Sequence, residues 1–200
     1  YGIDLIDPKD LVKVHSGTER TYSNKAILGA GTGLGKCIMF WSNRARRYIP
    51  VASEGGHADF AAQHPIELEL IDFIQKTEGL TCNVSWEDVL SGDGMKRIYA
   101  FFHANNAHHN EREQSPHPDE IFKSRDFDDH SKMTFELYTK LYARCAKDFV
   151  LDALALGGVY IAGGIAAHNL PMFQLPEFTE EFINCGKMGN YLKEVPVYVI

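Results

Sequence analysis

Short apolar runs separated by turn residues mark the first part of the chain. Three such runs, residues 25–28, 37–41 and 48–52, are rich in residues that favour strands. The segments that connect them are short, and short connections join antiparallel neighbours, because a parallel crossover needs a dozen or more residues. The pattern therefore predicts three antiparallel strands, and Pro50 suggests an edge or a strand end. The polar, turn-rich residues 1–24 predict no element.

Helical spacing replaces this pattern further along the chain. Apolar residues recur every four positions through residues 66–74, behind a proline that suits the first turn of a helix, and Gly79 is typical of a helix end. Ser85 and Asp88 have the spacing of a capping box, in which a serine and an acidic residue satisfy the first N–H groups of a helix. A helix over residues 65–78 and a short capped helix after Ser85 are therefore predicted.

The second half of the chain continues with helices and two short strands. The longest predicted helix begins at Ser131, carries apolar residues every three or four positions, and ends at Gly157-Gly158. The other predicted elements are helices over 95–102 and 177–185, strands over 159–162 and 195–200, and a polar loop with one short helix over 103–130. Antiparallel strands followed by alternating strands and helices predict an α/β fold: a mixed sheet, three antiparallel strands and then a βαβ unit, with helices packed on it.

Composition and charge restrict the possible partners. The chain has 200 residues, of which 44% are hydrophobic and 24% charged, enough for a packed core. Lys and Arg total 20 and Asp and Glu total 27, so the net charge is −7. This balance argues against nucleic acid, whose phosphates need a basic face. No apolar run approaches the roughly 18 residues of a membrane span, and no signal peptide is recognised.

The cysteines and histidines do not have the spacing of a metal site. The four cysteines, at positions 37, 82, 145 and 185, form no close pair of the kind that zinc or disulfide frameworks use. Histidines concentrate in the segment 103–130, without a helical i, i+4 pair. We therefore expect reduced thiols, no bound metal and a cytoplasmic location.

Glycine occupies every second position of one segment, Gly29-Ala30-Gly31-Thr32-Gly33-Leu34-Gly35. Backbone N–H groups without intervening side chains can converge on an anion, and the hydroxyl of Thr32 adds a donor. These residues alone leave two interpretations open, a phosphate cradle and a tight hairpin that needs flexible residues.

Two better-known phosphate-binding motifs do not fit this segment. The dinucleotide fingerprint requires glycine where Leu34 stands. The Walker A pattern requires glycine at Ala30 and serine or threonine at Cys37, and its loop opens a helix, whereas residues 37–41 resemble a strand. The remaining arrangement is a hairpin whose tip presents amides to phosphate.

A second glycine-containing bend follows the third predicted strand. Glu54 can accept hydrogen bonds from two neighbouring sugar hydroxyls, and His57 can donate to or accept from a third. Glu87, in the short capped helix, is a further acidic candidate. The alternative interpretations are an ordinary loop histidine and a first-turn carboxylate stabilised by the helix dipole. If both bends bind parts of one reaction, they must face a shared pocket.

Four separated segments together resemble the bacterial-type glucokinase family. They are residues 29–35, 54–60, 86–92 and 157–165, and their order and spacing match the family from about residue 24 to residue 200. The resemblance implies the ribonuclease H-like, actin-like ATPase fold, in which two α/β domains enclose a cleft for sugar and MgATP. It also implies the reaction of ATP with D-glucose that gives ADP and D-glucose 6-phosphate.

The resemblance also assigns roles to residues of this chain. Glu54, His57 and Glu87 match the family's glucose ligands. The residues that match its ATP-binding segments are Gly29, Ala30, Gly31, Thr32, Gly33, Gly163 and Gly164. The implied partners are glucose and ATP with Mg²⁺. Because the family often dimerises, a homodimer is a further expectation.

Two features of the family pattern are missing from these residues: the first phosphate loop and the Asn-Asp pair that carries the catalytic base. No catalytic residue is therefore assigned. Residues 25–200 are expected to be the large domain of a glucokinase, without its small domain and C-terminal helix, and to be inactive alone. The first residue, Tyr1 in place of Met, agrees with an excised piece.

Two other functions stay open. One is a ROK-type sugar kinase or sugar-responsive regulator, although the cysteine-rich zinc motif of that group is missing, since Cys82 is the sole cysteine between residues 58 and 144. The other is a nucleotide-binding module of the same fold without catalytic activity. Saturable binding of glucose separates the kinase from the nucleotide module.

Overall fold

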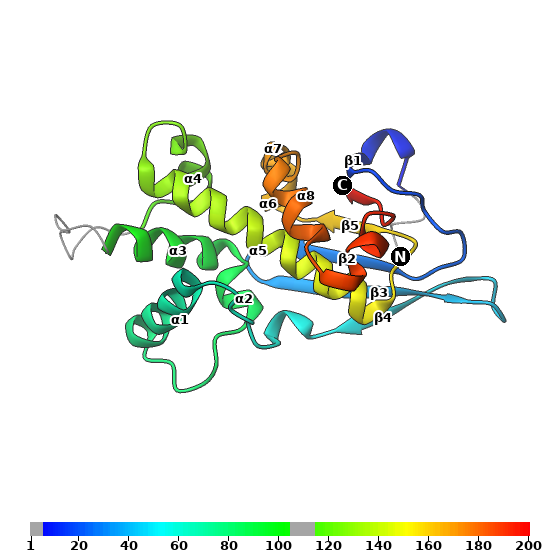
Figure 1. Ribbon diagram of the computed structural model, residues 1–200, viewed down its shortest axis with the longest axis horizontal. Helices are drawn as coiled ribbons and strands as arrows, with labels where there is room; N and C mark the ends of the chain where they lie inside the picture. Colours follow the sequence, from blue (N-terminus) through cyan, green and yellow to red (C-terminus); the bar gives the residue numbers. More distant parts are fainter. Residues whose placement is uncertain (1–5, 105–114) are drawn as a thin grey trace.

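A six-stranded mixed sheet organises the computed structural model, which describes residues 6–104 and 115–200 (Figure 1). The strands are β1 Val12–His15, β2 Lys25–Ala30, β3 Leu34–Ser42, β4 Arg47–Ser53, β5 Val159–Ala162 and β6 Val197–Val199. Their spatial order is β1-β6-β5-β2-β3-β4. Strands β2, β3 and β4 are antiparallel neighbours, whereas β5 is parallel to both β2 and β6. The predicted α/β fold with a mixed sheet is confirmed.

Helices cover one face of this sheet. In chain order they are α1 Pro65–Glu78, α2 Trp86–Val89, α3 Gly92–Ala104, α4 Pro118–Ser124, α5 Asp129–Ala153, α6 Gly164–His168, α7 Leu170–Phe173, α8 Pro176–Ile183 and α9 Gly189–Leu192, with 3-10 turns η2 Pro8–Asp10, η3 Gly55–His57 and η4 Gly186–Met188. Helix α5 runs alongside the sheet, and α1 to α4 gather beyond one end of the strands (Figure 1). Alternation along β2 directs Ala26, Leu28 and Ala30 into the core that these helices share. None of the described helices is both long enough and apolar enough to cross a bilayer.

The N-terminal segment supplies an element that the sequence pattern does not predict. Strand β1 lies at the edge of the sheet and pairs antiparallel with β6, so that Val12 lies opposite Val199. The side chain of His15 contacts the carbonyl oxygen of Val195 at 2.9 Å. Two of the four residues of β1 are exposed, and the strand shows too little apolar–polar alternation to be recognised from the sequence. Its pairing depends on a partner at the other end of the chain.

Several predicted boundaries are corrected by the structure. The glycine loop is shorter than expected, because Gly29 and Gly35 pair across β2 and β3 and only residues 31–33 turn. Helix α3 begins at Gly92, three residues before the predicted start, because the Ser91 hydroxyl accepts a hydrogen bond from the N–H of Gly94 at 3.0 Å and stabilises the first turn. The last strand occupies only Val197–Val199.

Other predictions are confirmed. Helix α1 ends at Glu78, and the Gly79 that follows is left-handed with φ 63°. The predicted capping box is present, since Ser85 and Asp88 exchange hydrogen bonds at the start of α2. Helix α4 is the single short helix expected between residues 103 and 130, of which residues 105–114, with two of the histidines, lie outside the described residues.

A buried ion pair joins α1 to α5 and α8. The guanidinium of Arg144 donates to both oxygens of Glu67, at 2.8 and 3.0 Å, and to Glu181 at 2.9 Å. Glu67 also accepts hydrogen bonds from the backbone N–H groups of Gln63 and His64. Burial works to raise the pKa of Glu67, but the hydrogen bonds from Arg144 and from these N–H groups outweigh it, so that its pKa is lowered. The carboxylate is therefore charged in the core.

Candidate functional site

The glycine hairpin lies where the sheet meets the helices. Strands β2 and β3 are joined by Gly31, Thr32 and Gly33, and the N–H of Gly31 donates to the carbonyl of Gly33 at 2.9 Å. The carbonyl of Gly31 in turn accepts from the N–H of Gly92 at 2.8 Å, which ties the turn to the start of α3. Strand, glycine turn and strand follow one another as predicted, and no helix follows the turn.

Two buried tyrosines of α5 form hydrogen bonds to the backbone on either side of the glycine turn and α3 junction. The hydroxyl of Tyr142 accepts a hydrogen bond from the N–H of Ala30 at 3.3 Å, and the hydroxyl of Tyr138 donates to the carbonyl of Ser91 at 3.4 Å. Burial raises the pKa of both tyrosines, so both stay protonated. One helix of the core therefore contacts the last residue of β2 and the residue before α3.

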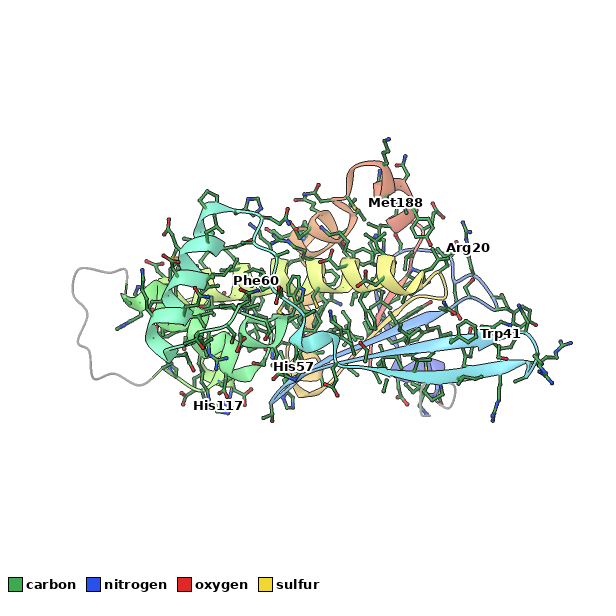
Figure 2. The ribbon with its side chains drawn as sticks, turned by 90° about the horizontal axis from the view of Figure 1, so that it is seen from below. Arg20, Trp41, His57, Phe60, His117 and Met188 are labelled. Atoms are coloured by element: carbon green, nitrogen blue, oxygen red, sulfur yellow. The ribbon has the colours of Figure 1, made fainter. Side chains whose placement is uncertain are left out.

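The second bend lies beside this hairpin because a short bridge connects it to α2. Figure 2 shows His57 at the boundary between the strands and the helical part. Beyond it, the N–H of Trp86 donates to the carbonyl of Ala58 at 2.9 Å, and the N–H of Phe60 donates to the carbonyl of Val84 at 2.8 Å. These two hydrogen bonds bring residues 57–60 next to the start of α2, and so bring His57 near Glu87.

Glu54, His57 and Glu87 form an open polar group. The imidazole lies between the two carboxylates, with Nε2 of His57 3.9 Å from Oε2 of Glu54 and Nδ1 3.9 Å from Oε1 of Glu87. Both distances exceed hydrogen-bonding range, so these atoms have capacity for a further polar partner. The side chains are 95%, 62% and 33% exposed, respectively. Such a group can receive several hydroxyls of a small polyol.

The carboxylate of Glu87 also reaches the glycine hairpin. Its Oε2 accepts a hydrogen bond from the N–H of Leu34 at 2.8 Å, and a Cβ on Gly33 would lie 2.6 Å from the same oxygen. Glycine at position 33 is therefore what permits this approach. The two bends lie close together, since Glu87 contacts the hairpin with one oxygen and faces His57 with the other.

The other predicted residues line the far side of the hairpin. Strand β5 runs parallel to β2 with Ala162 opposite Gly29, so that the turn at Gly163 and Gly164 lies next to the glycine hairpin. One open groove is lined by Gly29, Ala30, Gly31, Gly33, Gly163 and Glu87, among others. Thr32 and Gly164 line an adjoining cavity of about 430 Å³. The seven residues matched to ATP binding thus line one or the other of these two spaces, and Gly31 lines both.

The sequence interpretation missed the polar side chains of this cavity. Lys96, His117 and His168 also line it, and they come from three different helices or helix ends. The concentration of histidines between residues 103 and 130 was the available signal, but it does not indicate which of them faces a ligand. Among the described residues, no group of three or more His, Cys, Asp or Glu side chains could hold a metal ion.

Comparison with known proteins identifies the family. The glucokinase family model matches residues 1–200. This chain belongs to the glucokinase family. The glucokinase of Trichormus variabilis is 31% identical over 223 residues, which cover 100% of this chain and 63% of the relative. The glucokinase of an Antarctic psychrotroph, a solved structure, is 26% identical with a TM-score of 0.85, covering 98% of this chain and 59% of that one.

Two further solved structures define the wider fold. The glucokinase of Balamuthia mandrillaris in complex with glucose has a TM-score of 0.82 at 18% identity, covering 94% of this chain and 54% of that chain. The ROK hexokinase of Thermus thermophilus agrees less well, with a TM-score of 0.54 at 15% identity, covering 90% and 52%. The chain therefore has the fold of hexokinase-like sugar kinases, within the actin-like ATPase group, and resembles the two glucokinases described above more closely than this ROK hexokinase. It spans less than two thirds of the length of these glucokinases.

Proposed function

We propose that this chain forms part of an enzyme that transfers the γ-phosphoryl group of MgATP to the 6-hydroxyl of D-glucose. The observation that supports this most is the position of Glu87. One of its oxygens faces His57 in a polar group suited to a polyol, and the other accepts from an amide of the glycine hairpin. A sugar and a phosphate bound on these two sides would lie next to each other.

In this proposal each side of the hairpin has one task. Glu54, His57 and Glu87 hold the hydroxyls of glucose, so that the 6-hydroxyl faces the nucleotide. The N–H of Gly33 and the hydroxyl of Thr32 stabilise charge on the phosphates, while Gly31, whose own N–H donates to the carbonyl of Gly33, shapes the turn that presents them. Gly29, Ala30, Gly163 and Gly164 form the wall against which the nucleotide lies.

The described residues offer no assigned base, so we propose that residues 25–200 form the large lobe and that a second lobe completes the cleft. A carboxylate of that lobe would take the proton of the 6-hydroxyl while the oxygen attacks the γ-phosphorus in line and ADP leaves. Mg²⁺ enters with ATP as part of the substrate. These 200 residues alone would then have negligible kinase activity. A cytoplasmic location, where glucose and ATP meet, belongs to the same proposal.

Replacing Glu87 with glutamine tests the sugar site. Glutamine keeps the size of the side chain, and its carbonyl can still accept from Leu34, but the charge that strengthens the hydrogen bonds to glucose is lost. We expect the binding free energy of glucose to weaken by about 1–3 kcal/mol. Titration with glucose, followed by the fluorescence of the adjacent Trp86, measures this.

The exposed Glu180 provides the matched control, since Glu180→Gln makes the same change of charge on α8. Equal glucose affinity in the wild type and in Glu87→Gln would contradict the assignment of Glu87. A wild type that binds MgATP but shows no saturable response to glucose would favour the nucleotide-binding module over the kinase.

A further inference from the structure

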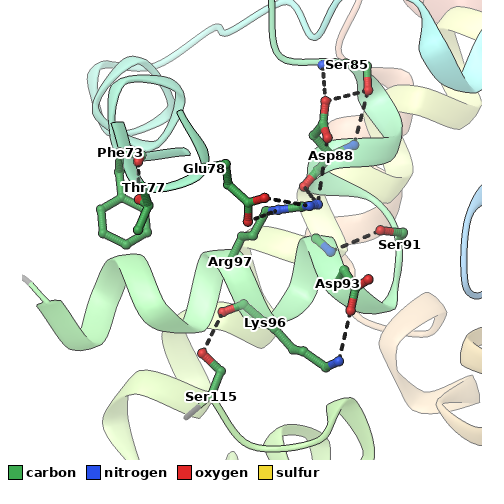
Figure 3. Close-up of polar contacts among 11 residues, drawn as sticks. Phe73, Thr77, Glu78, Ser85, Asp88, Ser91, Asp93, Lys96, Arg97 and Ser115 are labelled. Atoms are coloured by element: carbon green, nitrogen blue, oxygen red, sulfur yellow. Dashed lines mark hydrogen bonds and ion pairs between the residues drawn. The ribbon is translucent and has the colours of Figure 1, made fainter. Parts of the chain in front are cut away.

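Arg97 of α3 lies at the meeting point of three helices (Figure 3). Its Nε and Nη2 donate to the two carboxylate oxygens of Glu78, the last residue of α1, at 2.9 and 3.4 Å. Its Nη1 donates to the backbone carbonyl of Asp88 in α2 at 3.2 Å and lies 3.7 Å from the Asp88 carboxylate. One guanidinium therefore connects α1 and α2 to α3.

Helix α2 depends on such contacts because it has only four residues, Trp86–Val89. A helix this short is not stable in isolation, since nucleation costs more than one turn of hydrogen bonds returns. Its first turn is held by Ser85 and Asp88, which exchange hydrogen bonds at 2.8 and 3.3 Å. The side chain of Arg97 donates to a backbone carbonyl of this helix, that of Asp88, the residue that follows Glu87.

The environment of Arg97 keeps it charged and in place. Burial works to lower its pKa, but hydrogen bonding to and attraction by Glu78, together with the charges of Asp88 and Asp93, outweigh this, so that the pKa is raised. The side chain is 23% exposed, and its bidentate pair with Glu78 fixes the plane of the guanidinium. A planar donor with several N–H groups is suited to bridging two helices, in a way that lysine is not.

We propose that Arg97 is a positioning residue for the sugar site: by holding the carbonyl of Asp88, it sets the position of Glu87 against Leu34 and His57. Arg97 itself touches none of the residues assigned to glucose. Its effect on the sugar is transmitted through α2. This inference rests on the proposed function, because it assigns a consequence for glucose binding.

The test replaces Arg97 with methionine, which keeps an unbranched apolar stem and removes every donor. We expect glucose affinity to fall about tenfold, the size that the loss of a charge-assisted hydrogen bond gives. In the Glu87→Gln background the same substitution should change affinity by less than about twofold, since the effect passes through Glu87. Arg97→Lys, which keeps the charge and one donor, should lie between the wild type and Arg97→Met, and it stands in if the methionine variant does not fold.

Lys76→Met is the matched control, because Lys76 forms an exposed ion pair with Asp72 at 3.3 Å on the surface of α1. It should bind glucose as the wild type does. An unchanged glucose affinity in Arg97→Met would overturn the proposal. So would an equal loss in both backgrounds, which would indicate general destabilisation rather than positioning of Glu87.

A second readout does not depend on glucose. Without the Arg97 contact, the amides of residues 86–90 should exchange with solvent hydrogen at least about tenfold faster, while those of α5 stay as protected as in the wild type. Unchanged exchange at α2 overturns the role of Arg97 even if the protein binds no sugar. A wild type that does not bind glucose, combined with faster exchange in Arg97→Met, would instead refute the proposed function and leave Arg97 as the residue that holds α2.

Discussion

Replacing Gly56 with alanine is expected to remove measurable glucose binding and to lower the free energy of unfolding by about 3 kcal/mol, the upper range for overpacking a filled site. Gly56 is buried in the turn between Glu54 and His57. A Cβ at this position would lie 2.1 Å from the carbonyl oxygen of Leu34. That oxygen belongs to the backbone of β3, so relief requires the turn and the glycine hairpin to move apart.

The separation of these two segments explains why binding suffers more than stability. Moving the turn away from Leu34 displaces His57 and Glu54 together, whereas Glu87 stays with the hairpin through its hydrogen bond to the N–H of Leu34. The three proposed sugar ligands would then no longer fit one molecule of glucose. Glucose titration and urea unfolding of the same preparation measure the two effects.

The preceding residue of the turn provides the comparison. At Gly55 an added Cβ would lie 3.0 Å from Cδ of Lys36 and 3.0 Å from Oγ of Ser53, which are side-chain atoms that can rotate away. Gly55→Ala should therefore cost clearly less than Gly56→Ala in both measurements. If Gly56→Ala bound glucose with wild-type affinity, the close contact between the turn and β3 would not be needed for the site.

Replacing Glu67 with glutamine is expected to lower the free energy of unfolding by about 3–5 kcal/mol at neutral pH, because it leaves Arg144 charged and without its bidentate partner in the core. Arg144 is 2% exposed and Glu67 is 1% exposed, so water cannot replace the lost carboxylate. Glu69→Gln removes an exposed charge from the same helix and should stay within about 0.5 kcal/mol of the wild type. Urea unfolding at neutral pH checks both values.

The ion pair of Glu67 also makes the free energy of unfolding depend on pH. The pKa of Glu67 is lower in the folded protein than its usual value of about 4.5, which it regains on unfolding. Its contribution to stability is therefore fully present above the usual value and is lost as the pH falls through the lowered one. Glu67→Gln should be less sensitive to acid in this range than the wild type. Equal acid sensitivity of the two proteins would show that Glu67 does not carry this part of the pH dependence.

Local patterns in the sequence predict a large part of the fold. Short apolar runs joined by short turns indicate β2, β3 and β4. The i, i+4 repeat between Pro65 and Gly79 indicates α1, and the Ser85–Asp88 capping box indicates α2. These features depend on interactions between residues that are close in the chain, so one sequence contains them in full. The mixed sheet follows from the order of the elements.

The location of the candidate site could also be predicted, but its internal contacts could not. The two glycine-containing bends and Glu87 are recognised by residue type and spacing. Nothing in that spacing indicates that Leu34 donates to Glu87, or that Arg97 holds the carbonyl of Asp88. Each of these bonds is between residues on different elements, whose relative position is set by packing.

The sequence by itself determined the types of the main elements, the mixed sheet and the choice of candidate site residues, because each depends on short-range spacing or on a motif. Only the tertiary structure decided that β1 pairs with β6, that Glu67 and Arg144 meet in the core, and that Glu87 lies between His57 and the glycine hairpin. These contacts join residues tens to nearly two hundred positions apart, and the closure of such loops is specified by the packing of the whole core rather than by any local pattern.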